Sequence, residues 1–267
     1  MMKQRVITAL WSIPLVLAAI WFDKPWFPWF SLVIAAAAIL GILEFYRIAP
    51  LPRERLLTAF GVLWVLLFIL SPHLNDARIM PTLLASTVLV PLIWLLCRPS
   101  KENILSNWVW SCGGVIYVGW ALSLYVRLRE MPQGMEWTLL ALLSTFACDS
   151  AAFFVGRAWG KHPLIPTISP GKTKEGAIAG LAGAVAAVFI IGIILSPSLN
   201  HWQMALLGCL IGIFAQFGDM VESLLKRSAG VKESGRAIPG HGGMLDRLDS
   251  IIFVGIVVYY YAIWMGG

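Results

Sequence analysis

The chain has 267 residues, of which 59% are hydrophobic and only 13% are charged. A soluble globular protein of this size needs more polar residues to cover its surface, so the composition excludes that class and indicates a protein that lies in a membrane. The net charge of +6 would also suit a nucleic-acid partner, but no soluble basic domain is visible and we expect no nucleic acid.

Long apolar stretches follow one another along the chain, each close to the roughly 20 residues with which a helix crosses a bilayer. They predict an all-α integral membrane protein with about nine transmembrane helices. Lys3 and Arg5 before the first stretch are also typical of a signal peptide, but no convincing cleavage site follows them. The predicted spans lie within residues 5–23, 24–44, 55–76, 78–98, 102–127, 137–155, 176–196, 200–218 and 250–267.

The uncharged run from Gly176 to Gly218 is longer than the other stretches. A single helix of that length would be about twice as long as a bilayer is thick, so the run must contain a turn. Pro197 among the short polar residues of 196–200 favours a turn at that place.

Most of the 20 Lys and Arg residues fall in alternate loops, counted from the N-terminus. The positive-inside rule then predicts a cytoplasmic N-terminus and a C-terminus on the opposite side. We divide the chain into residues 1–135, with about five spans, and residues 136–267, with about four spans and two polar cytoplasmic loops.

Acidic residues lie in or beside the predicted spans of the C-terminal part, where a charge is costly and therefore indicates function. The ordinary alternative is a set of separate ion pairs, such as Glu222 with Lys226. We expect a shared cation site instead, and oxygen ligands without Cys or His favour Mg²⁺. The candidate metal ligands are Asp149, Asp219, Glu222, Asp246 and Asp249.

The loop over residues 168–176 contains the Gly-Lys-Thr of a P-loop. The first glycine of that motif would fall on Pro166 and no strand is predicted before it, so a true P-loop is excluded. A polar turn that leads into a helix N-terminus can still bind an anion, and the alternative is that the lysines only fix the topology. The candidate substrate-binding residues of this loop are Ser169, Lys172, Thr173, Lys174 and Glu175.

The second polar loop, over residues 223–249, combines basic side chains with a glycine-rich turn that lets backbone approach a ligand closely. His241 in this turn is a general acid, a phosphate ligand or simply a hydrogen-bonded turn residue. The candidate substrate-binding residues of the loop are Ser223, Arg227, Lys232, Arg236, Gly242, Gly243 and Arg247, with Lys226 beside them.

This second loop resembles the signature of phosphatidate cytidylyltransferases. Glu233 departs from it, because the family usually has Asp there. Residues 149–160 and 169–176 are also similar to this family, whereas the first five spans match only as hydrophobic helices. The matching signature residues are Ser223, Leu225, Lys226, Arg227, Lys232, Pro239, His241, Gly242, Gly243, Asp246, Arg247 and Asp249.

The resemblance implies that phosphatidic acid attacks the α-phosphorus of CTP, which gives CDP-diacylglycerol and pyrophosphate. It also implies Mg²⁺, alone or with a second cation, and a bacterial inner membrane with the site facing the cytoplasm. Membrane lipids would surround the protein, and a homodimer is left open. Catalytic roles are implied for Asp219, Lys226, His241, Asp246 and Asp249.

Two other classes remain open at this point. A secondary transporter would also carry buried acids, but the charges here gather at one surface and not at the bilayer midplane. Another membrane lipid phosphotransferase, such as a lipid kinase, would need similar charge neutralisation of its phosphates.

Overall fold

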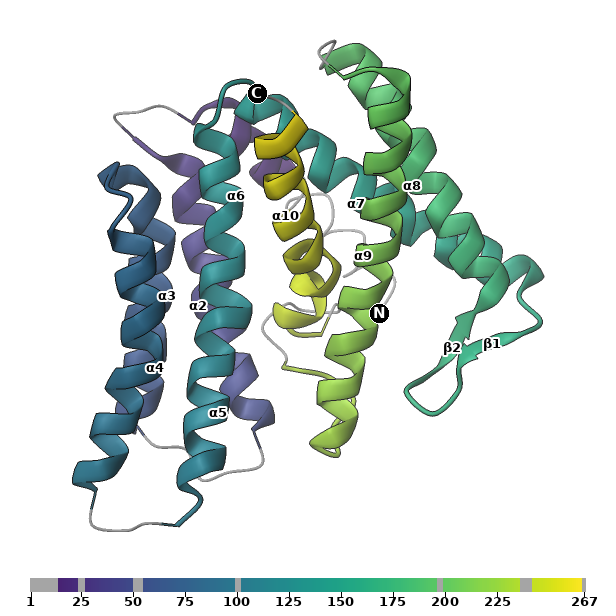
Figure 1. The fold of residues 1–267 in the computed structure, drawn as a ribbon. Helices are drawn as coiled ribbons and strands as arrows, with labels where there is room; N and C mark the ends of the chain where they lie inside the picture. The colour runs from purple at the N-terminus through teal and green to yellow at the C-terminus, as the bar shows by residue number, and fades with distance from the viewer. Residues whose placement is uncertain are drawn as a thin grey trace. The chain divides into compact units, whose positions relative to one another are not determined.

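The computed structural model describes residues 14–23, 27–49, 55–98, 102–195, 199–235 and 242–265. Within these ranges, eight helices are long and apolar enough to cross a membrane (Figure 1). They confirm the second to ninth predicted spans. Most of the first predicted span lies outside the described residues, although residues 14–21 at its end are helical.

Most helices begin and end near the charged residues that delimit the predicted spans, but α9 continues beyond its predicted end at residue 218 to Ser228. One span is composite, since α5 continues through the π-helical segment η2 into α6 without a break. The bounds are α2 Trp29–Ile48, α3 Arg55–Leu70 with the 3-10 turn η1 Ser71–Leu74, α4 Ile79–Cys97, α5 Ile104–Gly114, η2 Val115–Trp120, α6 Ala121–Glu130, α7 Gly134–Trp159, α8 Lys174–Leu195, α9 His201–Ser228 and α10 Leu245–Met265.

The chain divides into two compact units. The first comprises Met1–Val126 and Ala229–Asp246, and the second comprises Arg127–Ser228 and Arg247–Gly267. In the first unit α3 packs against α2 and η2. A Cβ atom on Gly119 would lie 3.0 Å from the Cα atom of Val65, so this glycine permits the close approach of η2 to α3.

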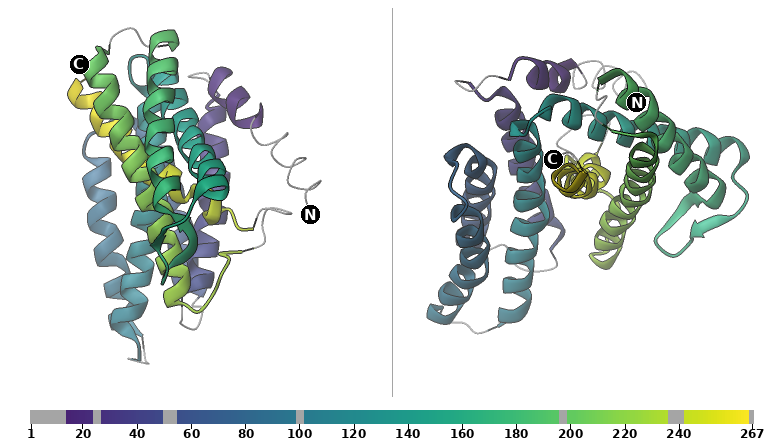
Figure 2. Two further views of the ribbon diagram at one scale, coloured as in Figure 1. Left: turned by 90° about the vertical axis from the view of Figure 1, so that its right-hand side faces the viewer. Right: turned by 45° about the horizontal axis from the view of Figure 1, so that its top comes forward.

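The second unit is built on α7, α8 and α9, with α10 beside them. Figures 1 and 2 show α8 and α9 running side by side, as the predicted turn at 196–200 requires. Small residues allow α7 and α8 to pack closely. A Cβ atom added to Gly183 of α8 would lie only 2.7 Å from the Cβ atom of Ala151 in α7. The Tyr261 hydroxyl of α10 donates a hydrogen bond of 2.8 Å to the carbonyl of Gln203 in α9.

A short β-hairpin joins α7 to α8, where the sequence predicts only a polar turn. Its strands are β1 Pro163–Ile165 and β2 Ser169–Thr173, which pair antiparallel with Pro163 opposite Thr173. The expectation that no strand precedes the Gly-Lys-Thr segment is therefore wrong. Strands of this length are too short to show the alternation of apolar and polar residues by which strands are predicted.

Candidate active site

Three acidic side chains from three helices of the second unit lie close enough to interact through their charges. Asp149 comes from α7, Asp219 from α9 and Asp249 from α10, and each lies within the range of charge–charge interaction with the other two. The hydroxyl of Ser250 also forms a hydrogen bond with the Asp149 carboxylate. We call Asp149, Asp219 and Asp249 the acidic trio.

Helix packing explains why the trio can gather. A Cβ atom on Gly218 would collide with the backbone carbonyl of Asp249, so only a glycine lets α9 and α10 approach this closely beside Asp219. On the α7 side, the thiol of Cys148 lies 3.8 Å from the carbonyl oxygen of Gly212 in α9. Gly218 and Cys148, each next to one of the acids, thus lie at close contacts between the helix backbones.

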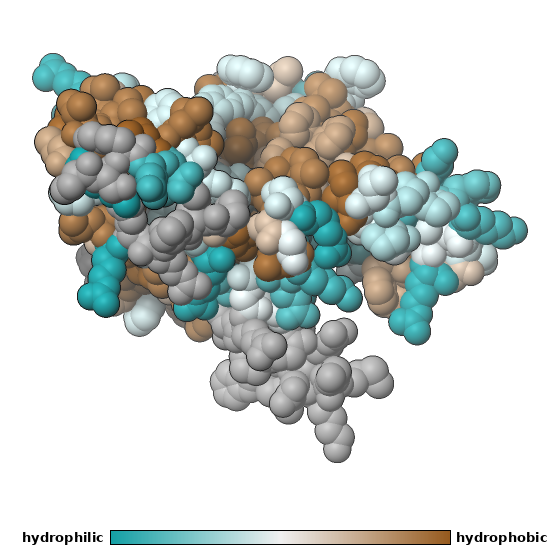
Figure 3. Space-filling view, turned by 90° about the horizontal axis from the view of Figure 1, so that it is seen from below, coloured by the Kyte–Doolittle hydropathy of each residue, from teal (hydrophilic) through white to brown (hydrophobic). Residues whose placement is uncertain are grey.

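Lysine and arginine side chains partly neutralise the trio. The Lys172 ammonium group of β2 lies 2.6 Å from the Asp219 carboxylate and also interacts with Asp149. Lys226 interacts with Asp249. The hairpin is further held to α9 because Arg227 donates a hydrogen bond of 3.3 Å to the Ile168 carbonyl. Figure 3 shows hydrophilic side chains gathered over the hairpin end of this unit.

The acidic trio offers the oxygen ligands that a hard cation prefers, but its side chains are not arranged around a common point. Carboxylate oxygens without Cys or His suit Mg²⁺. No three His, Cys, Asp or Glu side chains converge as metal ligands anywhere in the part of the chain that the structure describes. Lys172 supplies a positive charge at Asp219, where the sequence predicts a metal. The oxygen donors suit Mg²⁺ by their chemistry but not by their arrangement, and the metal assignment stays a prediction.

Glu222 does not join the trio. Its carboxylate is fully buried and forms an ion pair with Lys226, one helical turn away on α9. This pair is the ordinary alternative given for these two residues above. A buried carboxylate requires such a partner because removing a charge from water is costly.

The Asp246 carboxylate forms hydrogen bonds with the polar loop, and its predicted catalytic and metal-binding roles stay predictions. Its carboxylate accepts the backbone N–H of Gly243 at 2.8 Å and that of Ser234 at 3.3 Å. These contacts belong to the first unit and tie the polar loop to the start of α10. Gly242 adopts a φ of 85°, a conformation that favours glycine, so the turn before α10 depends on it.

The remaining residues of the hairpin mostly hold it together. The Thr173 hydroxyl accepts the N–H of Gly176 at 3.2 Å and so satisfies a free donor at the start of α8. Glu175 lies 2.5 Å from His162 and accepts the backbone N–H of Lys161. Lys174 is exposed at the first residue of α8, and Ser169 begins β2.

On α9, the Ser223 hydroxyl lies 3.5 Å from the Asp219 carboxylate. Lys232 and Arg247 are exposed. Arg236 and His241 lie outside the described residues, so their predicted roles stay predictions.

Sequence reasoning missed one buried acid. Glu44 of α2 is 1% exposed and contacts the polar loop. Its position at the end of a predicted span gave no signal, because charges are ordinary where a transmembrane helix ends. The residue is in fact inside α2, which continues to Ile48.

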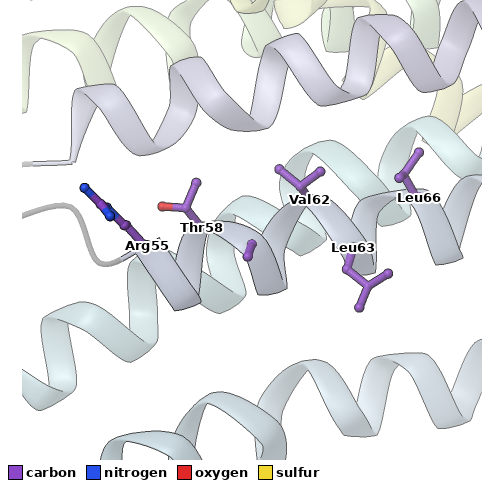
Figure 4. A pocket seen from close by; sticks show the side chains of 6 residues that line it. Arg55, Thr58, Val62, Leu63 and Leu66 are labelled. Carbon is purple, nitrogen blue, oxygen red and sulfur yellow. The ribbon is translucent and has the colours of Figure 1, made fainter.

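A pocket on the surface of α3 is separate from all of these residues. It is lined by apolar side chains together with Arg55 and Thr58 (Figure 4). None of the predicted site residues lines it.

Comparisons with known proteins agree over the whole length of the chain. The model of the cytidylyltransferase family matches residues 3–264. A phosphatidate cytidylyltransferase from Synechocystis is 31% identical, with 98% of this chain and 97% of that protein covered. Proteins of the same name from Staphylococcus haemolyticus and Pseudomonas aeruginosa are each 32% identical, and they cover 95% and 100% of this chain and 96% and 98% of their own lengths.

Proposed function

Because the chain belongs to the cytidylyltransferase family, we propose that it transfers the cytidylyl group of CTP to phosphatidic acid. The products are CDP-diacylglycerol, a precursor in phospholipid biosynthesis, and pyrophosphate. Relatives that match nearly the whole chain carry the name phosphatidate cytidylyltransferase. The observation that carries the proposal is the gathering of the acidic trio with Lys172 and Lys226 in one unit.

The reaction joins two anions, so the site must offset their repulsion. A phosphate oxygen of phosphatidic acid forms a bond to the α-phosphorus of CTP, and the bond to the β-phosphate breaks with its electrons leaving on pyrophosphate. Such phosphoryl chemistry needs positioning and charge stabilisation more than a covalent nucleophile. Lys172 and Lys226 would bind phosphate oxygens, with Arg227 at the edge of the hairpin.

Mg²⁺ bound by Asp149, Asp219 and Asp249 would supply positive charge to the triphosphate. The Lys172 ammonium group would then leave the Asp219 carboxylate and bind a phosphate oxygen of the substrate, because both groups are anionic and attract it. The acidic trio thus serves to hold the cation and to release Lys172 for the substrate.

The membrane placement supports a site that faces the cytoplasm, where CTP is dissolved. The basic loops indicate that the hairpin and the loop after α9 lie on the side of the N-terminus. We place the protein in the inner membrane of a bacterium, since its relatives are bacterial. Phosphatidic acid would reach the site from the surrounding lipid.

The test is an assay of the purified protein in vesicles that contain phosphatidic acid, with labelled CTP supplied at the accessible face. We expect labelled CDP-diacylglycerol and pyrophosphate in the presence of Mg²⁺ and neither after chelation. Vesicles with diacylglycerol and labelled ATP test for a lipid kinase. Movement of a solute across the membrane without any lipid product would overturn the proposal in favour of a transporter.

A further inference from the structure

Glu44 contacts the polar loop of the first unit from a helix far away in the sequence. Its Oε2 atom accepts a hydrogen bond of 3.1 Å from the Ser234 hydroxyl and one of 2.9 Å from the backbone N–H of Leu245. These partners lie 190 and 201 positions further along the chain. A carboxylate that is 1% exposed inside a membrane helix would be costly without such donors.

Ser234 connects this carboxylate to a second one. Its hydroxyl donates to Glu44, while its backbone N–H donates to Asp246 at 3.3 Å. Asp246 also accepts the N–H of Gly243 at 2.8 Å. The two carboxylates together hold both described ends of the loop, residues 231–235 and 242–245.

Two glycines of the loop pack closely against the Glu44 carboxylate. A Cβ atom on Gly235 would collide with its carboxylate, and one on Gly243 would collide with both Glu44 and the Ser234 hydroxyl. Leu245, whose N–H Glu44 accepts, is the first residue of α10, and α10 also carries Asp246 and Asp249. Glu44 therefore accepts an otherwise free N–H in the first turn of α10, next to Asp246.

We propose that Glu44 is a positioning residue for the cytidylyl transfer, which fixes the polar loop and the first turn of α10 without touching either substrate. This role rests on the proposed function. It differs from general support of α2, because the contacts that Glu44 makes are with the loop and with α10. Small displacements of reacting groups are expensive in rate, of the order of a hundredfold for about 1 Å.

The test compares Glu44→Ala, which removes the acceptor, with Glu44→Gln, which keeps an acceptor oxygen at the same reach. We expect Glu44→Ala to lower kcat by about tenfold to a hundredfold with KM for CTP changed by less than about threefold, and Glu44→Gln to recover most of the loss. Ser234→Ala should add little to the effect of Glu44→Ala, because the two residues act through one hydrogen bond.

A matched control is Asp23→Asn, in the same unit. The Asp23 carboxylate accepts the N–H of Phe30 at 3.0 Å and so anchors a different segment. This variant should keep wild-type kcat.

Hydrogen exchange provides a measurement that does not depend on the reaction. In Glu44→Ala the backbone amides of 231–235 and 242–246 should exchange at least about tenfold faster, while those of α2 stay as in the wild type. Unchanged exchange in the loop, or faster exchange with unaltered kcat, would overturn the positioning role. If the wild type makes no CDP-diacylglycerol, the proposed function fails by itself, and the exchange result still decides whether Glu44 anchors the loop.

Discussion

Lys172 and Lys226 differ in the carboxylates that they neutralise. Lys172 lies beside Asp219 in the acidic trio, and the two side chains are 25% and 37% exposed, although the ammonium nitrogen of Lys172 is itself buried. Lys226 is paired with the fully buried Glu222 and also interacts with Asp249. Substitution at the two positions should therefore have different consequences for stability and for catalysis.

Removal of a trio carboxylate should affect the reaction more than the fold. We expect Asp219→Asn and Asp249→Asn to lower kcat by at least about a hundredfold in the CTP and phosphatidate assay, because each loses charge that would hold the cation. Asp76→Asn, in an exposed turn of the first unit, is the control. Wild-type turnover in both trio variants would remove these acids from the site.

Lys172→Met should raise KM for CTP and reduce kcat/KM, because the variant loses a phosphate ligand without leaving a buried charge unpaired. Lys161→Met changes a lysine in the same loop region whose side chain is exposed, and it should behave as the wild type. Initial rates at varied CTP concentration measure both effects. Equal kcat/KM in the two variants would contradict a role for Lys172 in binding phosphate.

Lys226→Ala should destabilise the protein, because it leaves the Glu222 carboxylate buried without its partner. The cost of breaking a buried pair in this way is about 3–5 kcal/mol. The double variant Glu222→Gln, Lys226→Met should recover the thermal stability measured in detergent but not the activity. Recovery of both would show that Lys226 serves only the ion pair.

At the scale of the helices, one glycine decides whether α9 and α10 can bring their acids together. Gly218→Ala should separate the two helices, cost about 1–3 kcal/mol of stability and reduce kcat, because its Cβ atom would collide with the Asp249 carbonyl. Gly113→Ala is the matched control, since nothing lies within 4 Å of a Cβ atom there. Thermal unfolding and turnover should be measured on the same preparations, and equal values for the two variants would refute this packing.

The long helices could be predicted from the sequence, whereas the shorter elements could not. The eight described spans follow from runs without charge, because burial in lipid requires apolar residues over a length fixed by the bilayer. The hairpin β1–β2 was missed, because strands this short have no recognisable pattern. The π-helical segment η2 between α5 and α6 was not predicted either.

The candidate site was only partly predictable for a related reason. The sequence indicated that acids from several helices would gather, and Asp149, Asp219 and Asp249 do lie together in the second unit. Spacing by three residues could not reveal that Asp246 binds loop amides of the first unit. Hydrogen bonding to a distant loop is a tertiary property, as is the contact of Glu44 with Ser234.

For the whole molecule, the distribution of basic residues predicts the orientation in the membrane. A cysteine placed at Lys161 in the hairpin should react with an impermeant reagent only from the cytoplasmic face, after the exposed Cys97 is replaced by Ser. A fluorescent protein fused after Gly267 should stay dark, because such fusions do not mature when exported. Labelling from the opposite face or a bright fusion would reverse the orientation.

The contribution of α10 to the acidic trio also bears on how the protein is made. Membrane helices are inserted in the order of synthesis, and α10 follows α7 and α9 in the chain. A nascent chain that has delivered Asp149 and Asp219 to the bilayer still lacks the third acid, Asp249. The site is therefore completed only after α10 has been inserted, and ribosomes that stall before this helix would leave an inert product in the membrane.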